Sequence, residues 1–166
     1  MSNLTDLIFI FGAKYLYLII MIISFIWFLN QSKIGRKEIL IIICISFPLA
    51  FIVSKVAGHL YYNPQPFVLG HFQPLIPSKA DNGFPSHHTL LVSAISTVIF
   101  IFSRRMGFVL WVLALFVGFS RVYAGVHHTI DIVGSMLISI ISVTLVYFFR
   151  KQGDGSIFLK IFRKKK

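Results

Sequence analysis

The amino-acid sequence predicts an all-α protein, an integral membrane bundle of about five transmembrane helices with a sixth left open. Three observations predict this fold class. Hydrophobic residues make up 57% of the 166 residues, and the mean hydropathy of +0.84 is far above that of an ordinary soluble domain. A soluble fold could not bury this much apolar surface, so lipid must surround much of it. The apolar residues also gather in five runs, between which most charged residues lie.

We expect residues 1–166 to form one membrane-embedded domain, with the five apolar runs as its spanning helices. Crossing ~30 Å of hydrocarbon takes about 20 helical residues, so the third and fourth runs are short. They can span only if their polar ends, His88 and Arg121, lie in a pocket lined by protein. In order, the runs are Tyr15–Leu29 (or Leu7–Leu29), Ile39–Ser54, Thr89–Phe102, Gly107–Phe119 and Ile132–Phe149.

The stretch Leu4–Ala13 before the first run is ambiguous in sequence. Lys14 follows it and would favour an inside N-terminus, whereas five spans require the N-terminus to lie outside. An interfacial helix or an additional helix would each account for this stretch.

The basic residues predict which ends of the helices face the cytoplasm. The net charge of +11 suggests a nucleic-acid partner at first sight, but the lysines and arginines cluster at the ends of apolar runs. Twelve of the 16 lie in residues 30–37, in residues 103–106, or in a tail of about residues 150–166. The positive-inside rule places these three segments in the cytoplasm. The terminal run Arg163–Lys166 is expected to set topology and contact anionic lipid rather than nucleic acid.

The most informative motif is the stretch from Ser120 to Asp131. His127 and Asp131 are four residues apart and would share a helix face. The carboxylate can then hold one imidazole nitrogen while the other is free to attack an electrophile. Arg121 offers a fork of donors that suits phosphate oxygens. Charged groups between such apolar segments indicate a functional site.

Three polar clusters are expected to meet at one membrane face. Between His88 and Arg121 the chain crosses the membrane twice, so both residues lie at the same face, and Lys55 reaches that face at the end of the second run. Phosphate chemistry needs cations, an in-line nucleophile and an acid for the leaving oxygen. Lys55 and Arg121 would supply the cations, His127 the nucleophile and His88 the acid. Ser86 and the amides at the start of the third helix could add donors.

These clusters resemble the motifs of the type 2 phosphatidic acid phosphatase (PAP2) family, which shares its site with vanadium haloperoxidases. The last motif of the family matches in full, the middle motif has His87 where glycine is usual, and the first motif has Gln65 where arginine is usual. The sequence around the motifs looks most like that of the bacterial undecaprenyl pyrophosphate phosphatases of the bacitracin-resistance type. The matching positions are Lys55 and Pro66, then Pro85, Ser86 and His88, then Ser120, Arg121, His127 and Asp131.

The resemblance implies a PAP2/haloperoxidase-like helical fold and a two-step reaction that uses no metal and no cofactor. His127 would attack phosphorus and form a phosphohistidine, and Asp131 would orient and charge-stabilise it. His88 would protonate the leaving oxygen and then deprotonate the water that frees phosphate. The residues expected to bind the substrate are Lys55, Arg121, Ser86, Ser120, Gln65 and His87.

The implied function is hydrolysis of undecaprenyl pyrophosphate to undecaprenyl phosphate at the outer face of a bacterial inner membrane. The partners are then a lipid phosphate and the bilayer; the oligomeric state is not predicted. One alternative is a phosphatase for lipid A, phosphatidylglycerophosphate or phosphatidic acid. Another is a catalytically impaired lipid-binding or transport relative, because Gln65 carries no charge. A zinc site would need other spacing than adjacent histidine pairs, and Arg121 disfavours a dication.

Overall fold

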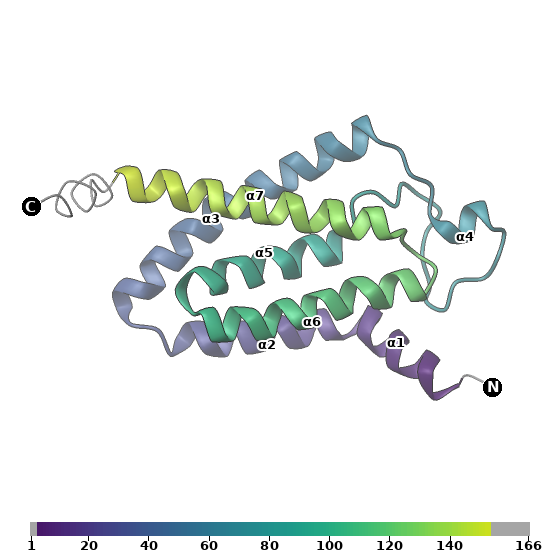
Figure 1. Cartoon of the computed structure of the whole chain (residues 1–166), viewed down its shortest axis with the longest axis horizontal. Helices are drawn as coiled ribbons and strands as arrows, with labels where there is room; N and C mark the ends of the chain where they lie inside the picture. Colours follow the sequence, from purple (N-terminus) through teal and green to yellow (C-terminus); the bar gives the residue numbers. More distant parts are fainter. Residues whose placement is uncertain (1–2, 154–166) are drawn as a thin grey trace, which may run out of the picture.

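The computed structural model describes residues 3–153, and within that range the chain is all-helical (Figure 1). The prediction of an all-α bundle is therefore confirmed. The terminal basic run Arg163–Lys166 lies outside the described residues. The helices are α1 (Leu4–Lys14), α2 (Leu16–Leu29), α3 (Lys33–Leu60), α4 (Pro66–Leu69), α5 (His87–Phe102), α6 (Arg104–Tyr123) and α7 (Thr129–Gly153).

Four of the five apolar runs lie inside helices that continue into polar residues at one or both ends, whereas the first run coincides with α2. The second run, Ile39–Ser54, becomes the 28-residue helix α3. Its start is fixed by Ser32, whose hydroxyl accepts a hydrogen bond from the amide of Gly35 at 3.1 Å. Hydropathy marks only the residues in hydrocarbon, so it underestimates helices that extend into the interface.

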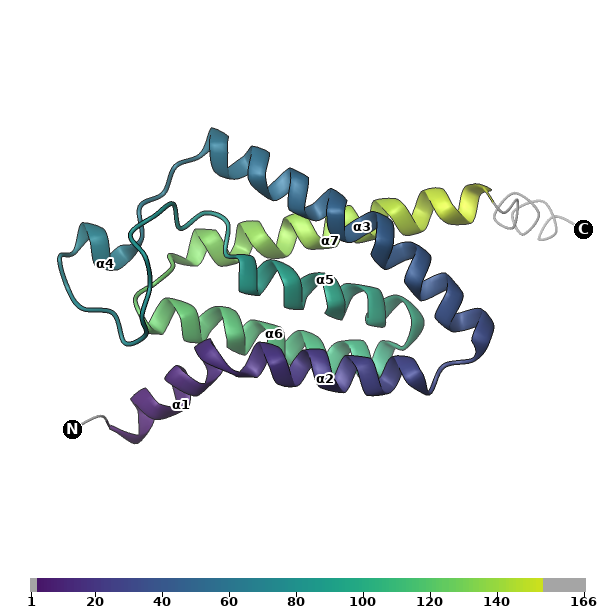
Figure 2. The same cartoon turned by 180° about the vertical axis from the view of Figure 1, so that it is seen from behind.

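The helices α3, α6 and α7 are each long and apolar enough to cross a membrane, and α1 with α2 passes the same test as one pair bent by 50°. The ambiguous stretch Leu4–Ala13 thus forms most of α1, which is a candidate for a span only together with α2. Helix α5 has only 16 residues, and in both views it lies between α6 and α7 (Figures 1 and 2). Protein rather than lipid therefore surrounds most of this short helix, as its length required.

Small polar side chains hold α7 against α5 where the polar clusters meet. The hydroxyl of Ser135 donates to the carbonyl oxygen of Ser86 at 3.0 Å, and the hydroxyl of Ser139 donates to that of Leu90 at 2.7 Å. Hydrogen bonds of this kind replace the hydrophobic driving force that helices lack inside a membrane. They set the first turn of α7 beside the first turn of α5.

Large apolar side chains cover the outside of the bundle. Phe25, Ile52, Phe119, Ile141 and Phe149 are all more than half exposed, and they come from α2, α3, α6 and α7. A water-soluble monomer does not expose apolar surface on this scale. Lipid must therefore surround the helices, and the chain is a multi-pass membrane protein.

Candidate active site

The helix ends that carry the predicted site residues lie at one end of the bundle, next to the connection that carries α4 (Figure 1). His88 lies in the first turn of α5, Arg121 in the last turn of α6 and Asp131 in the first turn of α7. The two crossings between His88 and Arg121 thus return the chain to the same end, as the count of spans predicted.

His127 and Asp131 form a buried pair in which imidazole Nδ1 lies 3.4 Å from carboxylate Oδ2. They do not share a helix face as the spacing predicted, because α7 begins only at Thr129. A tight turn brings them together instead. Gly125 has a φ of +77°, a conformation that favours glycine, and the amide of Val126 bonds back to the carbonyl oxygen of Arg121 at 3.2 Å.

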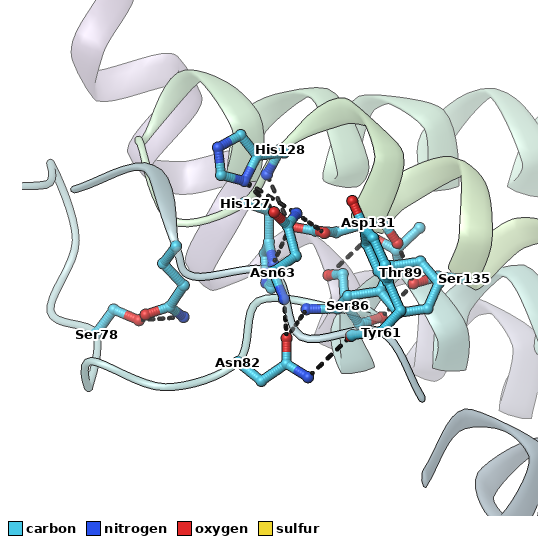
Figure 3. Close-up of polar contacts among 12 residues, drawn as sticks. Tyr61, Asn63, Ser78, Asn82, Ser86, Thr89, His127, His128, Asp131 and Ser135 are labelled. Carbon is cyan, nitrogen blue, oxygen red and sulfur yellow. Dashed lines mark hydrogen bonds and ion pairs between the residues drawn. The ribbon is translucent and has the colours of Figure 1, made fainter. Parts of the chain in front are cut away.

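The Asp131 carboxylate is held through both of its oxygens. Oδ1 accepts a hydrogen bond from Nδ2 of Asn63 at 2.7 Å, and Oδ2 accepts one from the amide of His128 at 2.8 Å. The Asn63 amide also contacts Nδ1 of His128 at 3.1 Å. Figure 3 shows Asn63 pointing toward His128 and Asp131. Asp131 is fully buried, so these bonds fix the carboxylate in the direction of His127.

Asn63 is a site residue that the sequence reasoning missed, although it lies inside the first polar cluster. Two hydrogen bonds join its backbone to the segment before α5. The amide of Asn63 donates to Oδ1 of Asn82 at 2.9 Å, and its carbonyl oxygen accepts from the amide of Gly83 at 2.8 Å. Asn82 in turn donates to the carbonyl oxygen of Gly58 at 2.7 Å. The sequence shows a polar side chain at Asn63, near Gln65, but the sequence pattern does not predict the direction in which this side chain points.

His127 lies in the turn before α7, and its surroundings favour the neutral imidazole. Burial lowers the pKa of His127 below its usual value, and the guanidinium of Arg121 acts in the same direction, whereas the Asp131 carboxylate opposes the shift. At 3.4 Å, the contact with Asp131 is not an aligned hydrogen bond, and it becomes an ion pair only when the imidazole is protonated. Nδ1 faces the carboxylate, so Nε2 is the nitrogen left for nucleophilic attack.

Arg121 is a buried cation without a carboxylate partner in residues 3–153. Its side chain is 9% exposed. Nη1 donates to the carbonyl oxygen of Ala13 at 3.2 Å, while the buried Nε has no hydrogen-bond partner among the described residues. Burying an unpaired charge costs several kcal/mol. The arrangement therefore fits an anion that supplies both the missing charge and the missing acceptor.

The two adjacent histidines of α5 point to different surroundings. The half-buried His88 ring packs edge-to-face on Tyr17, with ring centroids 4.8 Å apart, and lies within electrostatic range of Arg121 and His127. His87 is more exposed, with its ring centroid 6.4 Å from that of Phe51, and it lies within electrostatic range of Lys55, His127 and Arg121. Of the two, His88 is the one enclosed by the site.

The two predicted serines are fully buried next to the histidines and the arginine. Ser86 occupies the N-cap position of α5, yet its side chain makes no capping bond and instead accepts from the hydroxyl of Thr89 at 3.2 Å. The hydroxyl of Ser120 has no partner in the described part of the chain. Neither hydroxyl donates a hydrogen bond to another described residue, so each keeps a donor.

Lys55 and Gln65 lie at the edge of this group. Lys55 is exposed near the end of α3, with Nζ 5.3 Å from the centre of the Phe51 ring. Gln65 is buried, and its Nε2 donates to the hydroxyl of Ser78 at 3.2 Å while Oε1 has no partner in the described residues. Gly83 separates it from the carboxylate: a Cβ built there would lie 3.3 Å from Cγ of Gln65 and 2.9 Å from Oδ2 of Asp131.

Comparison with known proteins shows which family the chain resembles. The model of the PAP2 superfamily matches residues 39–153. The chain is 32% identical over 148 residues to the bacitracin transport permease protein BcrC of Bacillus licheniformis, covering 89% of this chain and 72% of that protein. It is 31% identical to the undecaprenyl-diphosphatase BcrC of Bacillus subtilis strain 168, covering 89% of this chain and 76% of that protein.

Two solved structures share the fold. The crystal structure of Aquifex aeolicus LpxE superposes with a TM-score of 0.65 at 24% identity, covering 89% of this chain and 87% of that one. A transmembrane PAP2-type phosphatidylglycerolphosphate phosphatase from Bacillus subtilis superposes with a TM-score of 0.63 at 21% identity, covering 92% and 79%. At these identities the likeness concerns the fold.

Proposed function

The chain belongs to the PAP2 superfamily and is a membrane lipid phosphatase, and we propose that it hydrolyses undecaprenyl pyrophosphate to undecaprenyl phosphate. The relative from Bacillus subtilis named undecaprenyl-diphosphatase aligns with 89% of this chain. Relatives with the same activity in their names come from Escherichia coli and Sulfolobus acidocaldarius, at 30% and 29% identity. This agreement among names favours a polyprenyl pyrophosphate over other lipid phosphates.

The observation that carries the proposal is the buried, uncompensated guanidinium of Arg121 beside the His127–Asp131 pair. A phosphoryl group would supply the missing negative charge and accept a hydrogen bond from Nε of Arg121. The hydroxyls of Ser86 and Ser120 would donate to the other nonbridging oxygens. Donors that the fold holds in fixed positions need little reorganisation as charge develops on the oxygens.

In the first step, Nε2 of His127 attacks the terminal phosphorus in line with the bond to the bridging oxygen. That bond breaks, and a protonated His88 gives its proton to the leaving undecaprenyl phosphate. Asp131 stabilises the positive charge that develops on the imidazole of His127.

In the second step, neutral His88 takes a proton from water, and the water oxygen attacks phosphorus. The phosphorus–nitrogen bond breaks, inorganic phosphate leaves and His127 is restored. His88 regains its proton in the same step, so the cycle closes with one water consumed.

Two apolar clefts, one bordering the site and one farther along the bundle, support a long hydrocarbon chain on the substrate. The first, of about 300 Å³, lies between α3 and α5 and is lined by His87, Phe51 and Phe47 among others. Phe47 also lines the second, of about 310 Å³, between α2, α3 and α5. An isoprenoid chain could therefore run from the phosphate site down the side of the bundle without entering water.

The proposed location of the site is the outer face of a bacterial inner membrane. Basic residues of the described chain concentrate at the opposite end of the bundle, where α2 joins α3 and α5 joins α6 (Figure 2). The positive-inside rule places that end in the cytoplasm. The basic residues at the two junctions are Lys33, Arg36, Lys37, Arg104 and Arg105.

The test is phosphate release by the purified protein in detergent with EDTA. Undecaprenyl pyrophosphate is compared with lipid A, phosphatidylglycerophosphate and phosphatidic acid. We expect the highest kcat/KM for undecaprenyl pyrophosphate, no loss in EDTA, and loss of activity in His127→Ala. His59→Ala is the matched control, because His59 is exposed and lies outside the site.

Each alternative gives a distinct result. A higher kcat/KM for another lipid would overturn the choice of substrate but keep the lipid phosphatase. Lipid binding without phosphate release would indicate the catalytically impaired relative. Activity that disappears with EDTA would contradict the metal-free reaction.

A further inference from the structure

The first two helices precede the part of the chain that the PAP2 family model matches, which begins at residue 39. They nevertheless contact two side chains of the site. The carbonyl oxygen of Ala13 accepts a hydrogen bond from Nη1 of Arg121 at 3.2 Å. The Tyr17 ring packs against the His88 ring at 4.8 Å between centroids, with the ring planes at 87°. Tyr17 is also within electrostatic range of Arg121.

The break between α1 and α2 explains how one helix pair reaches both side chains. The helices meet at Tyr15 with a bend of 50°. A helix end leaves its last carbonyl groups without partners inside the helix, and it attracts cations. Arg121 satisfies the Ala13 carbonyl at the end of α1, while Tyr17 lies four residues later in the first turn of α2. The bend thus presents both groups to the same site.

Contacts with α6 fix the position of α1. The hydroxyl of Tyr123 donates to Oδ1 of Asp6 at 3.0 Å, and the rings of Phe9 and Tyr123 lie 4.1 Å apart. Gly12 packs so closely on Ser120 that an added Cβ would lie 2.3 Å from the serine hydroxyl oxygen. Helix α1 is therefore fastened to the last turns of α6, next to Arg121.

We propose that Tyr17 is a positioning residue for His88. The perpendicular ring contact restricts rotation of the imidazole, so that its proton-carrying nitrogen stays aimed at the leaving oxygen. The Ala13 carbonyl does the same for the guanidinium of Arg121. Proton transfer depends steeply on such placement, so the bent helix pair is a working part of the phosphatase site. This inference rests on the proposed role of His88 in catalysis.

The test is a kinetic cycle with Tyr17→Leu, His88→Ala and the double variant. Phosphate release is measured from undecaprenyl pyrophosphate, phosphatidic acid and p-nitrophenyl phosphate. Because general acid–base catalysis contributes about 10²–10⁴-fold and misplacement removes part of it, we expect Tyr17→Leu to lower kcat about 10–100-fold with little change in KM. Tyr17→Phe keeps the ring and should retain most of the activity.

The effect of Tyr17→Leu in the His88→Ala variant distinguishes a positioning role for Tyr17 from a general structural role. In His88→Ala, the added Tyr17→Leu change should cost less than about twofold, because there is no imidazole left to position. Phe11→Leu is the matched control, since Phe11 is 48% exposed and lies on the same helix pair away from the joint at Tyr15. The imidazole proton signals of His88 in NMR spectra should shift in Tyr17→Leu but stay close to wild type in Tyr17→Phe.

An equal loss of kcat from Tyr17→Leu in both backgrounds would overturn the positioning role while leaving the proposed function intact. Unchanged His88 signals in Tyr17→Leu would do the same, because they would show that the contact is absent. A wild-type protein that releases no phosphate from any of the three substrates would overturn the proposed function, and with it the role of Tyr17.

Discussion

Asn63→Ala is the substitution that tests most sharply how the site is held. It removes the hydrogen bond of 2.7 Å to Oδ1 of Asp131 and leaves the bond from the amide of His128 to Oδ2. A hydrogen bond to a charged group contributes about 1.5–3 kcal/mol. At about 1.36 kcal/mol per factor of ten in rate, losing this much transition-state stabilisation would lower kcat about 10–150-fold.

The isosteric Asn63→Asp change should be more severe. It replaces the donor with a second carboxylate next to buried Asp131, and two like charges at this distance cannot both ionise. One of the two carboxyls then binds a proton, which weakens the charge that supports His127. Asn63→Asp should therefore be slower than Asn63→Ala, although it changes the shape of the side chain least.

The assay is steady-state phosphate release together with the thermal midpoint of each variant. Asn30→Ala is the matched control, because Asn30 lies at the opposite end of the bundle and its side chain donates to the carbonyl oxygen of Ile26. Wild-type kcat in Asn63→Ala, or Asn63→Asp faster than Asn63→Ala, would refute the assigned role of Asn63. A loss that follows the unfolded fraction would show that Asn63 supports the fold only.

Three further predictions follow from charge. Because burial lowers the pKa of His127 and its neutral form is the nucleophile, enzyme phosphorylation by p-nitrophenyl phosphate should be constant at neutral pH and fall only below about pH 6.5; stopped-flow measurements that place the decline above pH 7 would contradict this. Arg121→Met should lower kcat/KM at least about 100-fold, yet leave the thermal midpoint equal or higher without ligand, because a buried uncompensated charge is removed; a large drop in the midpoint would show that the charge is compensated. Gln65→Arg adds a guanidinium beside the site and should change KM or kcat for lipid phosphates; unchanged constants would remove Gln65 from substrate binding.

The positions of the helices and the meeting of the motifs could be predicted because both follow from the membrane. A span must be apolar and must change sides, so counting crossings was enough to bring His88 and Arg121 together. Hydropathy did not predict the helix ends. Helix α3 runs from Lys33 to Leu60 and so continues beyond its apolar centre at both ends.

The fine structure of the site could not be predicted, because it depends on turns and on contacts distant in sequence. His127 sits in a turn set by Gly125 rather than on α7, and a spacing of four residues fits either arrangement. Asn63 reaches Asp131 across 68 positions, and Ala13 reaches Arg121 across 108. Neither contact produces a periodic pattern in the sequence, because contacts made by loop side chains and backbone carbonyl groups do not depend on a regular spacing of residues.

The central claim is that His127 becomes phosphorylated during turnover. Rapid acid-free quenching with ³²P-labelled substrate, followed by peptide mapping, measures this directly. The account predicts an alkali-stable, acid-labile phosphohistidine at His127. With p-nitrophenyl phosphate, whose good leaving group lets the first step proceed without His88, this intermediate should accumulate to a higher level in His88→Ala. Phosphate on another residue, or turnover by wild type with no phosphoenzyme at any quench time, would contradict it.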